Sequence, residues 1–78
     1  MDKNLYLKKC ELEKQLYNIP AGEHAKQIIK DRYNMDINKL YDFFVMIIED
    51  NNRLKIWYDI EFLDGNNKYK RLRFYKNV

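Results

Sequence analysis

The residues best suited to chemistry in this sequence are cations mixed with aromatic rings near its end. The segment from Lys68 to Lys76 combines Lys and Arg with Tyr and Phe. Arg and Lys can contact phosphates while neighbouring rings stack on unpaired bases, as in proteins that bind single-stranded nucleic acid. The binding residues predicted from this segment and from the strand expected before it are Lys55, Trp57, Lys68, Tyr69, Lys70, Arg71, Arg73, Tyr75 and Lys76.

The net charge is distributed unevenly along the chain. Residues 66–78 hold five basic residues and no acid, a charge of +5, whereas residues 1–65 hold ten basic and twelve acidic residues, a charge of −2. The total of +3 therefore comes from the C-terminal segment. A basic segment of this kind indicates a polyanionic or acidic partner.

Few residues offer catalytic chemistry. The chain has no Ser or Thr, and its two glycines, Gly22 and Gly65, cannot form a phosphate-binding glycine-rich loop. Cys10 and His24 are the one thiol and the one imidazole, but a Cys beside Leu12 on a helix is typical of a small core residue, and His24 is expected on a solvated helix surface. We therefore predict a non-enzymatic protein without catalytic residues. The enzyme class left open is a metal-free ribonuclease that uses Arg, Lys and Tyr on a sheet.

Metal and cofactor sites are not expected either. One Cys and one His cannot supply an ordinary zinc site. Asp59 and Glu61 are spaced to share a strand face and could ligate a metal, but Arg73 and Arg71 are expected directly opposite them. An ion-pair ladder between the two strands is the prediction.

The strand that would carry these carboxylates shows the strongest pattern in the sequence. From Arg53 to Leu63, apolar residues occupy alternate positions, which places them on one face of a strand: Leu54, Ile56, Tyr58, Ile60 and Phe62. Asn51-Asn52 before it and residues 64–67 after it favour tight turns. This strand is therefore predicted to lie between two antiparallel neighbours.

Side-chain matching fixes the register of both predicted hairpins. In the first, Asp50 faces Arg53, Ile47 faces Ile56, Val45 faces Tyr58 and Phe43 faces Ile60. In the second, Ile60 faces Leu72, Tyr58 faces Phe74, Glu61 faces Arg71, Asp59 faces Arg73 and Trp57 faces Tyr75. A slip of one residue would set apolar side chains against charges, so both registers are strongly specified.

Two amphipathic helices are predicted before the strands, over residues 4–17 and 21–33, with Pro20 breaking the chain between them. Residues 34–50 are ambiguous. We expect a short helical turn near residues 36–41 and a strand from Phe43 to Glu49, because the matching register favours the strand. The alternative is a third helix over residues 37–48.

These elements predict an α+β fold in one domain, residues 1–78: two N-terminal helices packed on a three-stranded antiparallel β-meander. The alternative, three helices plus a C-terminal β-hairpin, resembles a winged helix in its order of elements, and no sequence motif adds to that resemblance. One sheet face would pack under the helices, while the other would carry Lys55, Trp57, Tyr69, Arg71, Arg73 and Tyr75.

The functional hypothesis is a small accessory protein that binds nucleic acid through this basic and aromatic surface. The abundance of Lys, Asn, Ile and Tyr, whose codons are AT-rich, suggests a phage or another mobile element. The alternatives are an inhibitor or modulator of a nucleic-acid enzyme, for example anti-CRISPR-like, a ribonuclease toxin, and a homodimer that uses the same face. A lone Cys and the lack of any long apolar run predict a cytoplasmic protein without membrane contact.

Overall fold

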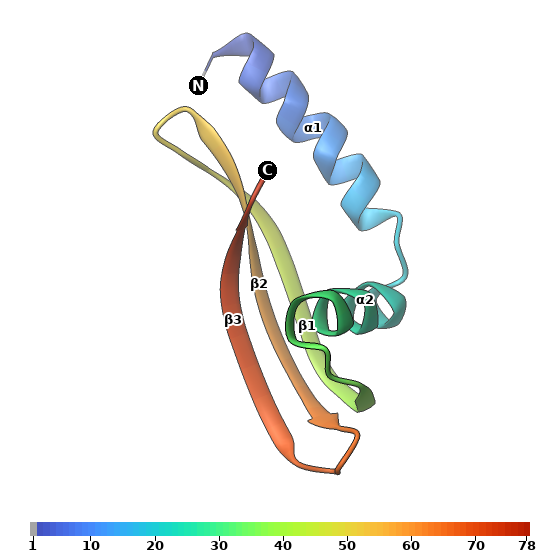
Figure 1. Cartoon of the computed structure of the whole chain (residues 1–78). Coiled ribbons are helices and arrows are strands. Elements are labelled where there is room, and N and C mark those ends of the chain that lie inside the picture. The colour runs from blue at the N-terminus through green and yellow to red at the C-terminus, as the bar shows by residue number, and fades with distance from the viewer. Residues whose placement is uncertain (1) are drawn as a thin grey trace.

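The computed structural model describes residues 2–78 and has an α+β fold (Figure 1). Two helices precede three strands that form one antiparallel sheet in the order β1-β2-β3. The elements are α1 (Lys3–Tyr17), α2 (Ala21–Tyr33), β1 (Ile37–Asp50), β2 (Arg53–Asp64) and β3 (Tyr69–Asn77). The predicted helices and meander are confirmed.

Local signals set the ends of both helices. The Asp2 carboxylate accepts hydrogen bonds from the backbone amides of Asn4 (2.7 Å) and Leu5 (3.1 Å), so it caps α1 as its type and position predict. Pro20 directly precedes α2. That helix ends at Tyr33, and its C-cap residue Asn34 has a φ of 53°, in the left-handed region that Asn tolerates better than most residues.

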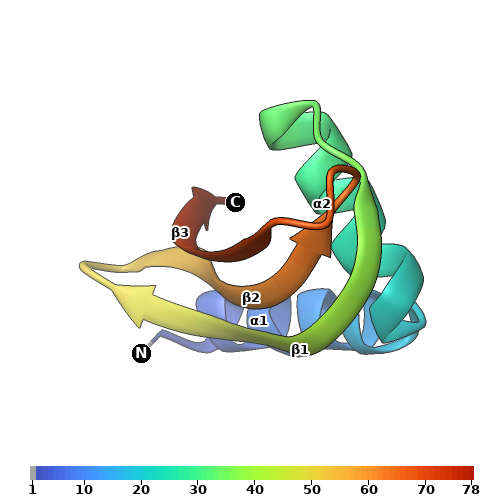
Figure 2. The same ribbon diagram turned by 90° about the horizontal axis from the view of Figure 1, so that it is seen from below.

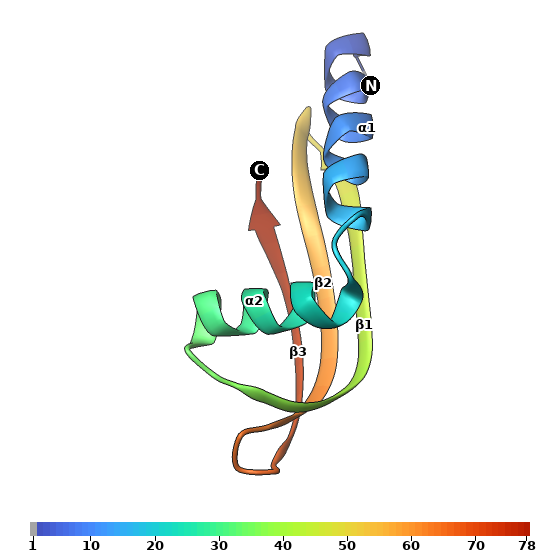
Figure 3. The same ribbon diagram turned by 90° about the vertical axis from the view of Figure 1, so that its right-hand side faces the viewer.

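Both helices lie on one face of the sheet. Helix α2 crosses the strands, whereas α1 runs roughly along them (Figure 3). The view along the strands shows that the sheet is curved and that the two helices share one side of it (Figure 2). We call the opposite side, which no element of residues 2–78 covers, the outer face.

The core forms between α2 and the helix-facing side of the sheet. Leu54, Ile56, Tyr58, Ile60 and Phe62 are all buried, as the alternating pattern of β2 predicts. Ala25, Ile28 and Ile29 of α2, with Ile47 and Phe74, complete it. Helix α1 contributes the partly buried Leu5, Leu12 and Leu16 but has no fully buried residue. The buried core is therefore small, and α1 is its least firmly packed element.

The registers of both hairpins are as predicted. In the first, Asp50 pairs with Arg53 and Val45 with Tyr58. In the second, Ile60 pairs with Leu72 and Trp57 with Tyr75. Asn51 and Asn52 both have positive φ, 52° and 60°, which is the backbone that a two-residue hairpin turn needs.

The expected helical turn near residues 36–41 is wrong, and so is the third-helix alternative, because β1 begins at Ile37. The pairing of β1 with β2 shifts between Ile37 and Lys39 and again between Leu40 and Asp42, as at β-bulges. Each shift inserts one residue, so every third residue faces the helices. Ile37, Leu40 and Phe43 thereby acquire a helix-like spacing within a strand.

The prediction of a solvated His24 is also wrong. His24 is only 4% exposed, and its Nε2 lies 3.2 Å from the Tyr58 hydroxyl. The Phe43 ring lies edge-on at a centroid distance of 5.2 Å. Burial, with a smaller contribution from Lys76, lowers the pKa of His24, because the imidazolium would lose its hydration. The imidazole is therefore neutral in the core.

This burial makes stability depend on pH. Below the ordinary His pKa of about 6.5, the unfolded chain binds a proton on His24 more readily than the folded chain does, because the pKa is lowered in the folded chain. The free energy of unfolding is therefore expected to fall as the pH drops from about 7.5 to 5.5, with a slope of at most about 1.4 kcal/mol per pH unit. Urea unfolding at several pH values measures it. The variant His24→Gln should lose this slope, since His24 is the one His in the chain; an unchanged slope in that variant would contradict the assignment.

Candidate nucleic-acid interface

Three rows of paired residues make up the centre of the outer face. Met46, Trp57 and Tyr75 form one row, Phe44, Asp59 and Arg73 the next, and Asp42, Glu61 and Arg71 the third. The Trp57 and Tyr75 rings lie 4.7 Å apart between centroids. Tyr75 and Tyr69 remain 54% and 58% exposed. The outer face thus presents accessible rings beside charged side chains.

A network of carboxylates holds Arg71. Its Nε and Nη2 donate to the two Asp59 carboxylate oxygens at 3.1 and 2.9 Å, and Nη1 lies 3.7 Å from Glu61 Oε1. The Tyr69 hydroxyl donates to Glu61 Oε2 at 2.9 Å. The hydrogen bonds from Arg71 lower the pKa of Asp59, and the bond to Glu61 raises the pKa of Tyr69. The charge of Arg71 is thus largely compensated.

The predicted ladder of directly opposite ion pairs is only partly right. Asp59 is opposite Arg73 in the register, yet it binds the diagonal neighbour Arg71. Diagonal residues on one face of a sheet are within reach of long side chains. Arg73 has no carboxylate within 4.0 Å in the described part of the chain. The network therefore leaves Arg73 available for a ligand.

The predicted binding residues do not all share one face. Lys55, Trp57, Tyr69, Arg71, Arg73 and Tyr75 come together on the outer face. Lys70 and Lys76 pair with Phe62 and Ile56, so they belong to the helix-facing side. Lys55 donates to Asp50 at 3.1 Å. The cations and rings of the prediction are thus divided between two surfaces that meet at β3.

Lys68 lies in the turn before β3, and Asp64 shapes that turn. The Asp64 carboxylate accepts from the backbone amides of Lys68 (3.0 Å) and Asn66 (2.8 Å). These bonds lower its pKa, because they stabilise the charged carboxylate. These two hydrogen bonds hold the backbone of the turn that leads into β3.

The strand β3 lies at the edge of the sheet and carries cations on both of its faces. Side chains from either face of an edge strand can reach its open side. Arg73 extends from the outer face, and Lys70 and Lys76 from the helix-facing side. Arg32 of α2 joins them, its guanidinium 4.3 Å from the centroid of the Phe74 ring. We call these four residues, Arg32, Lys70, Arg73 and Lys76, the basic edge.

The basic edge has little acidic compensation. None of its cations lies within 4.0 Å of a carboxylate among residues 2–78. Asp31 lines a pocket of about 220 Å³ together with Arg32, Phe74 and Lys76. Asp59 lies opposite Arg73, and the charges of Arg73 and Lys70 contribute to the lowered pKa values of Asp59 and Asp64. The basic edge is therefore a surface on which a chain of phosphates can lie.

Apolar residues of β1 that lie on the outer face were missed in the sequence. Phe44 and Met46 of β1 are 48% and 37% exposed and lie beside Asp59 and Trp57. The register predicted for the first hairpin already implies their position. It places Val45 on the helix-facing side, so Phe44 and Met46, one residue to each side of Val45, lie on the outer face. The outer face is thus more apolar towards β1 and more cationic towards β3.

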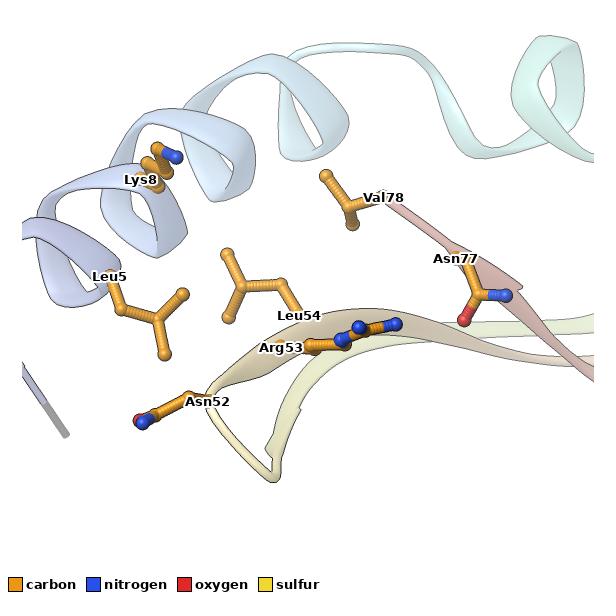
Figure 4. A pocket seen from close by; sticks show the side chains of 7 residues that line it. All are labelled: Leu5, Lys8, Asn52, Arg53, Leu54, Asn77 and Val78. Carbon is orange, nitrogen blue, oxygen red and sulfur yellow. The ribbon is translucent and has the colours of Figure 1, made fainter.

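A separate pocket lies where α1 approaches the β1–β2 turn (Figure 4). It measures about 380 Å³, and Leu5 and Leu54 extend into the space between helix and sheet. Lys8 and Arg53 are its cations. No carboxylate side chain lines it, so it offers no acid–base pair.

Other chemistry is limited in the described residues. Cys10 is half-buried on α1, and His24 is buried against Tyr58. Residues 2–78 contain no cluster of three His, Cys, Asp or Glu side chains that could hold a metal ion. Among the same residues, neither helix has the length and apolarity needed to cross a membrane.

Comparison with known proteins identifies no relative. No protein-family model, curated protein or solved structure matches the chain. The basic edge and the outer face are therefore the features from which a function can be inferred.

Proposed function

We propose that this protein binds single-stranded nucleic acid along the basic edge, without catalysing a reaction. The observation that supports this most strongly is that the edge strand β3 carries Lys70, Arg73 and Lys76, none of which has a carboxylate within 4.0 Å among residues 2–78. Exposed rings of Tyr69 and Tyr75 lie on the same strand. Cations that follow a backbone beside rings that stack on bases are the usual elements of such a site.

The charge network gives the two surfaces different roles in this proposal. Because Asp59 and Glu61 compensate Arg71, the outer face beside β3 is not strongly cationic. Phosphates would instead follow the basic edge, and bases would turn onto Tyr75 and Tyr69. Stacking depends little on sequence, since every base has an aromatic face. We therefore expect weak sequence preference.

The cellular setting is part of the same proposal. A small basic protein suits an accessory role in a phage or another mobile element. It would act in the cytoplasm, where its lone Cys stays reduced.

A second candidate function is the binding and inhibition of a nucleic-acid enzyme, as anti-CRISPR-like proteins do. The observation that favours it is the exposure of Phe44 and Met46 beside Trp57 on the outer face. Aromatic residues, Met and Arg are enriched at protein interfaces. This candidate uses the part of the outer face nearest β1 rather than the basic edge.

A salt titration tests the primary proposal. We expect binding to labelled single strands of about 12 nucleotides, of both DNA and RNA. With four phosphates neutralised, the affinity should fall about 50-fold between about 50 and 200 mM salt, because bound counterions are released. Fluorescence anisotropy measures both.

Two outcomes of this titration would oppose the proposal. No binding at low salt would reject nucleic acid as the ligand and favour the protein-binding candidate. Cleavage of the RNA probe during the measurement, detected on a denaturing gel and retained through repurification, would support the ribonuclease alternative and contradict a non-enzymatic role.

A further inference from the structure

The two open edges of the sheet differ in how they are protected. The β3 edge carries Lys and Arg side chains, which discourage pairing with another strand. The Phe43–Ile48 part of the β1 edge has no such protection, because it is a run of six apolar residues without charge, Pro or Gly and the bulges of β1 lie before it. Apart from its pairing with β2, this run makes no backbone hydrogen bond within residues 2–78. Such an edge is a template for a further strand.

Exposed apolar side chains gather on both sides of the same edge. Phe44 and Met46 are exposed on the outer face. On the helix side, Tyr17 and Ile19 are 55% and 37% exposed. A pocket of about 420 Å³ lies between them and β1, with Val45 in its lining. A strand added to β1 would cover apolar surface on both faces of the sheet at once.

We propose that the partner at this edge is a second copy of the chain, whose β1 pairs antiparallel with β1 to make one continuous six-stranded sheet. In a two-fold arrangement centred on Val45, this residue faces its own copy. Phe44 then faces Met46 of the partner on the outer face. Phe43 faces Ile47 of the partner on the helix side. Apolar side chains thus meet apolar side chains over five consecutive positions.

Charge and the bulge of β1 favour the register centred on Val45 over the two registers centred on Phe44 or Met46. A centre at Met46 would set Asp42 against Asp50 of the partner, and like charges directly opposite one another are unfavourable. A centre at Phe44 would set Ile47 against Tyr41, where the bulge of β1 interrupts regular pairing. The centre at Val45 keeps these carboxylates apart, because Asp42 then faces Ile48, and it leaves the bulge outside the five apolar pairs. The self-complementarity of one short segment is the reason to assign a second copy rather than an unrelated strand.

The small core gives this association a structural role. A chain of 78 residues buries a limited share of its surface, and domains of this size often gain support from a partner subunit. The pairing leaves both basic edges at the outer ends of the joined sheet. Pairing at the β1 edge does not depend on nucleic-acid binding at the basic edge. A protein that binds no nucleic acid could still form this dimer.

Molar mass in solution is the first test. Light scattering after size exclusion, from about 1 µM to about 500 µM, should show a rise towards twice the monomer mass of 9.7 kDa. Phe44→Lys is expected to weaken self-association at least about tenfold, because it sets a charge against the partner's apolar Met46. The matched control Tyr75→Lys changes the same outer face at the opposite edge and should leave the mass unchanged. A monomer at every concentration, or a dimer that Tyr75→Lys splits and Phe44→Lys does not, would overturn the proposal.

Cross-linking tests the register itself. In a Cys10→Ala background, Val45→Cys should form a disulfide-linked dimer under mild oxidation, since residues opposite in a sheet have Cβ atoms about 5 Å apart. Met46→Cys, one position away and facing Phe44 of the partner, should cross-link much more slowly. Equal rates for the two variants, or no cross-link from Val45→Cys, would refute pairing centred on Val45.

Discussion

Replacing Tyr58 by Ala is expected to lower the free energy of unfolding by about 3–5 kcal/mol, the usual cost of truncating a buried aromatic residue. Tyr58 is 1% exposed and lies at the centre of the core. Its ring stacks on Phe74 at 5.1 Å and meets His24 edge-on at 5.6 Å. The truncation therefore leaves a cavity between the middle strand, β3 and α2.

The loss expected for Tyr58→Ala is a large part of the total free energy of unfolding. Domains of this size have total stabilities of roughly 5 kcal/mol or a little more. Tyr58→Ala should consequently populate the unfolded state in water at moderate temperature. Urea unfolding followed by circular dichroism measures this, and a loss below about 1 kcal/mol would contradict the assigned core.

One further variant separates the contributions of the Tyr58 ring and hydroxyl, and a second variant, at Tyr17, serves as a control. Tyr58→Phe keeps the ring but leaves His24 Nε2 without its partner, which should cost about 1–3 kcal/mol. Tyr17→Ala removes a ring of the same type that is 55% exposed, and it should change stability by no more than about 0.5 kcal/mol.

The sheet was predictable where local chemistry and side-chain matching agree. The alternating pattern of β2 identifies its buried face without knowledge of the fold. Asn51-Asn52 supplies the positive φ of the first turn, and matching residues on each side fix the register. These signals lie within the strands and turns themselves, so no tertiary information was required.

The start of β1 was not predictable for a specific physical reason. Two extra residues in the strand give Ile37, Leu40 and Phe43 a spacing of three, which periodicity alone assigns to a helix. Their partners on β2 show that all three face the helices. Only the neighbouring strand distinguishes a twice-bulged strand from a helical turn.

The candidate site was predictable in composition but not in arrangement. The sequence indicates which cations and rings belong to β3. The structure shows that the predicted binding residues of β3 lie on both of its faces, with Lys70 and Lys76 on the helix-facing side and Arg73 on the outer face. Arg71 binds Asp59 diagonally, which sequence register does not reveal. The burial of His24 likewise depends on the direction in which α2 crosses the sheet (Figure 3).

Reversing the charges of the basic edge is expected to have the largest effect on nucleic-acid binding. The triple variant Lys70→Glu, Arg73→Glu and Lys76→Glu replaces three phosphate contacts by repulsion. Affinity for single strands should fall more than about 100-fold at low salt, and the slope of log affinity against log salt should drop by about 2, near 0.7 for each lost contact. Anisotropy titrations at several salt concentrations measure both quantities.

A matched variant distinguishes a localised site from general attraction. Lys3→Glu, Lys14→Glu and Lys26→Glu make the same change in net charge at exposed positions on the two helices. If phosphates follow the basic edge, this variant should retain most of the affinity and nearly the full salt slope, because screening weakens distant charges over about 10 Å at moderate salt. Equal losses in the two triple variants would show that only net charge matters and would reject β3 as the binding site. A loss confined to the β3 variant, with circular dichroism unchanged, would assign the phosphate contacts to that strand.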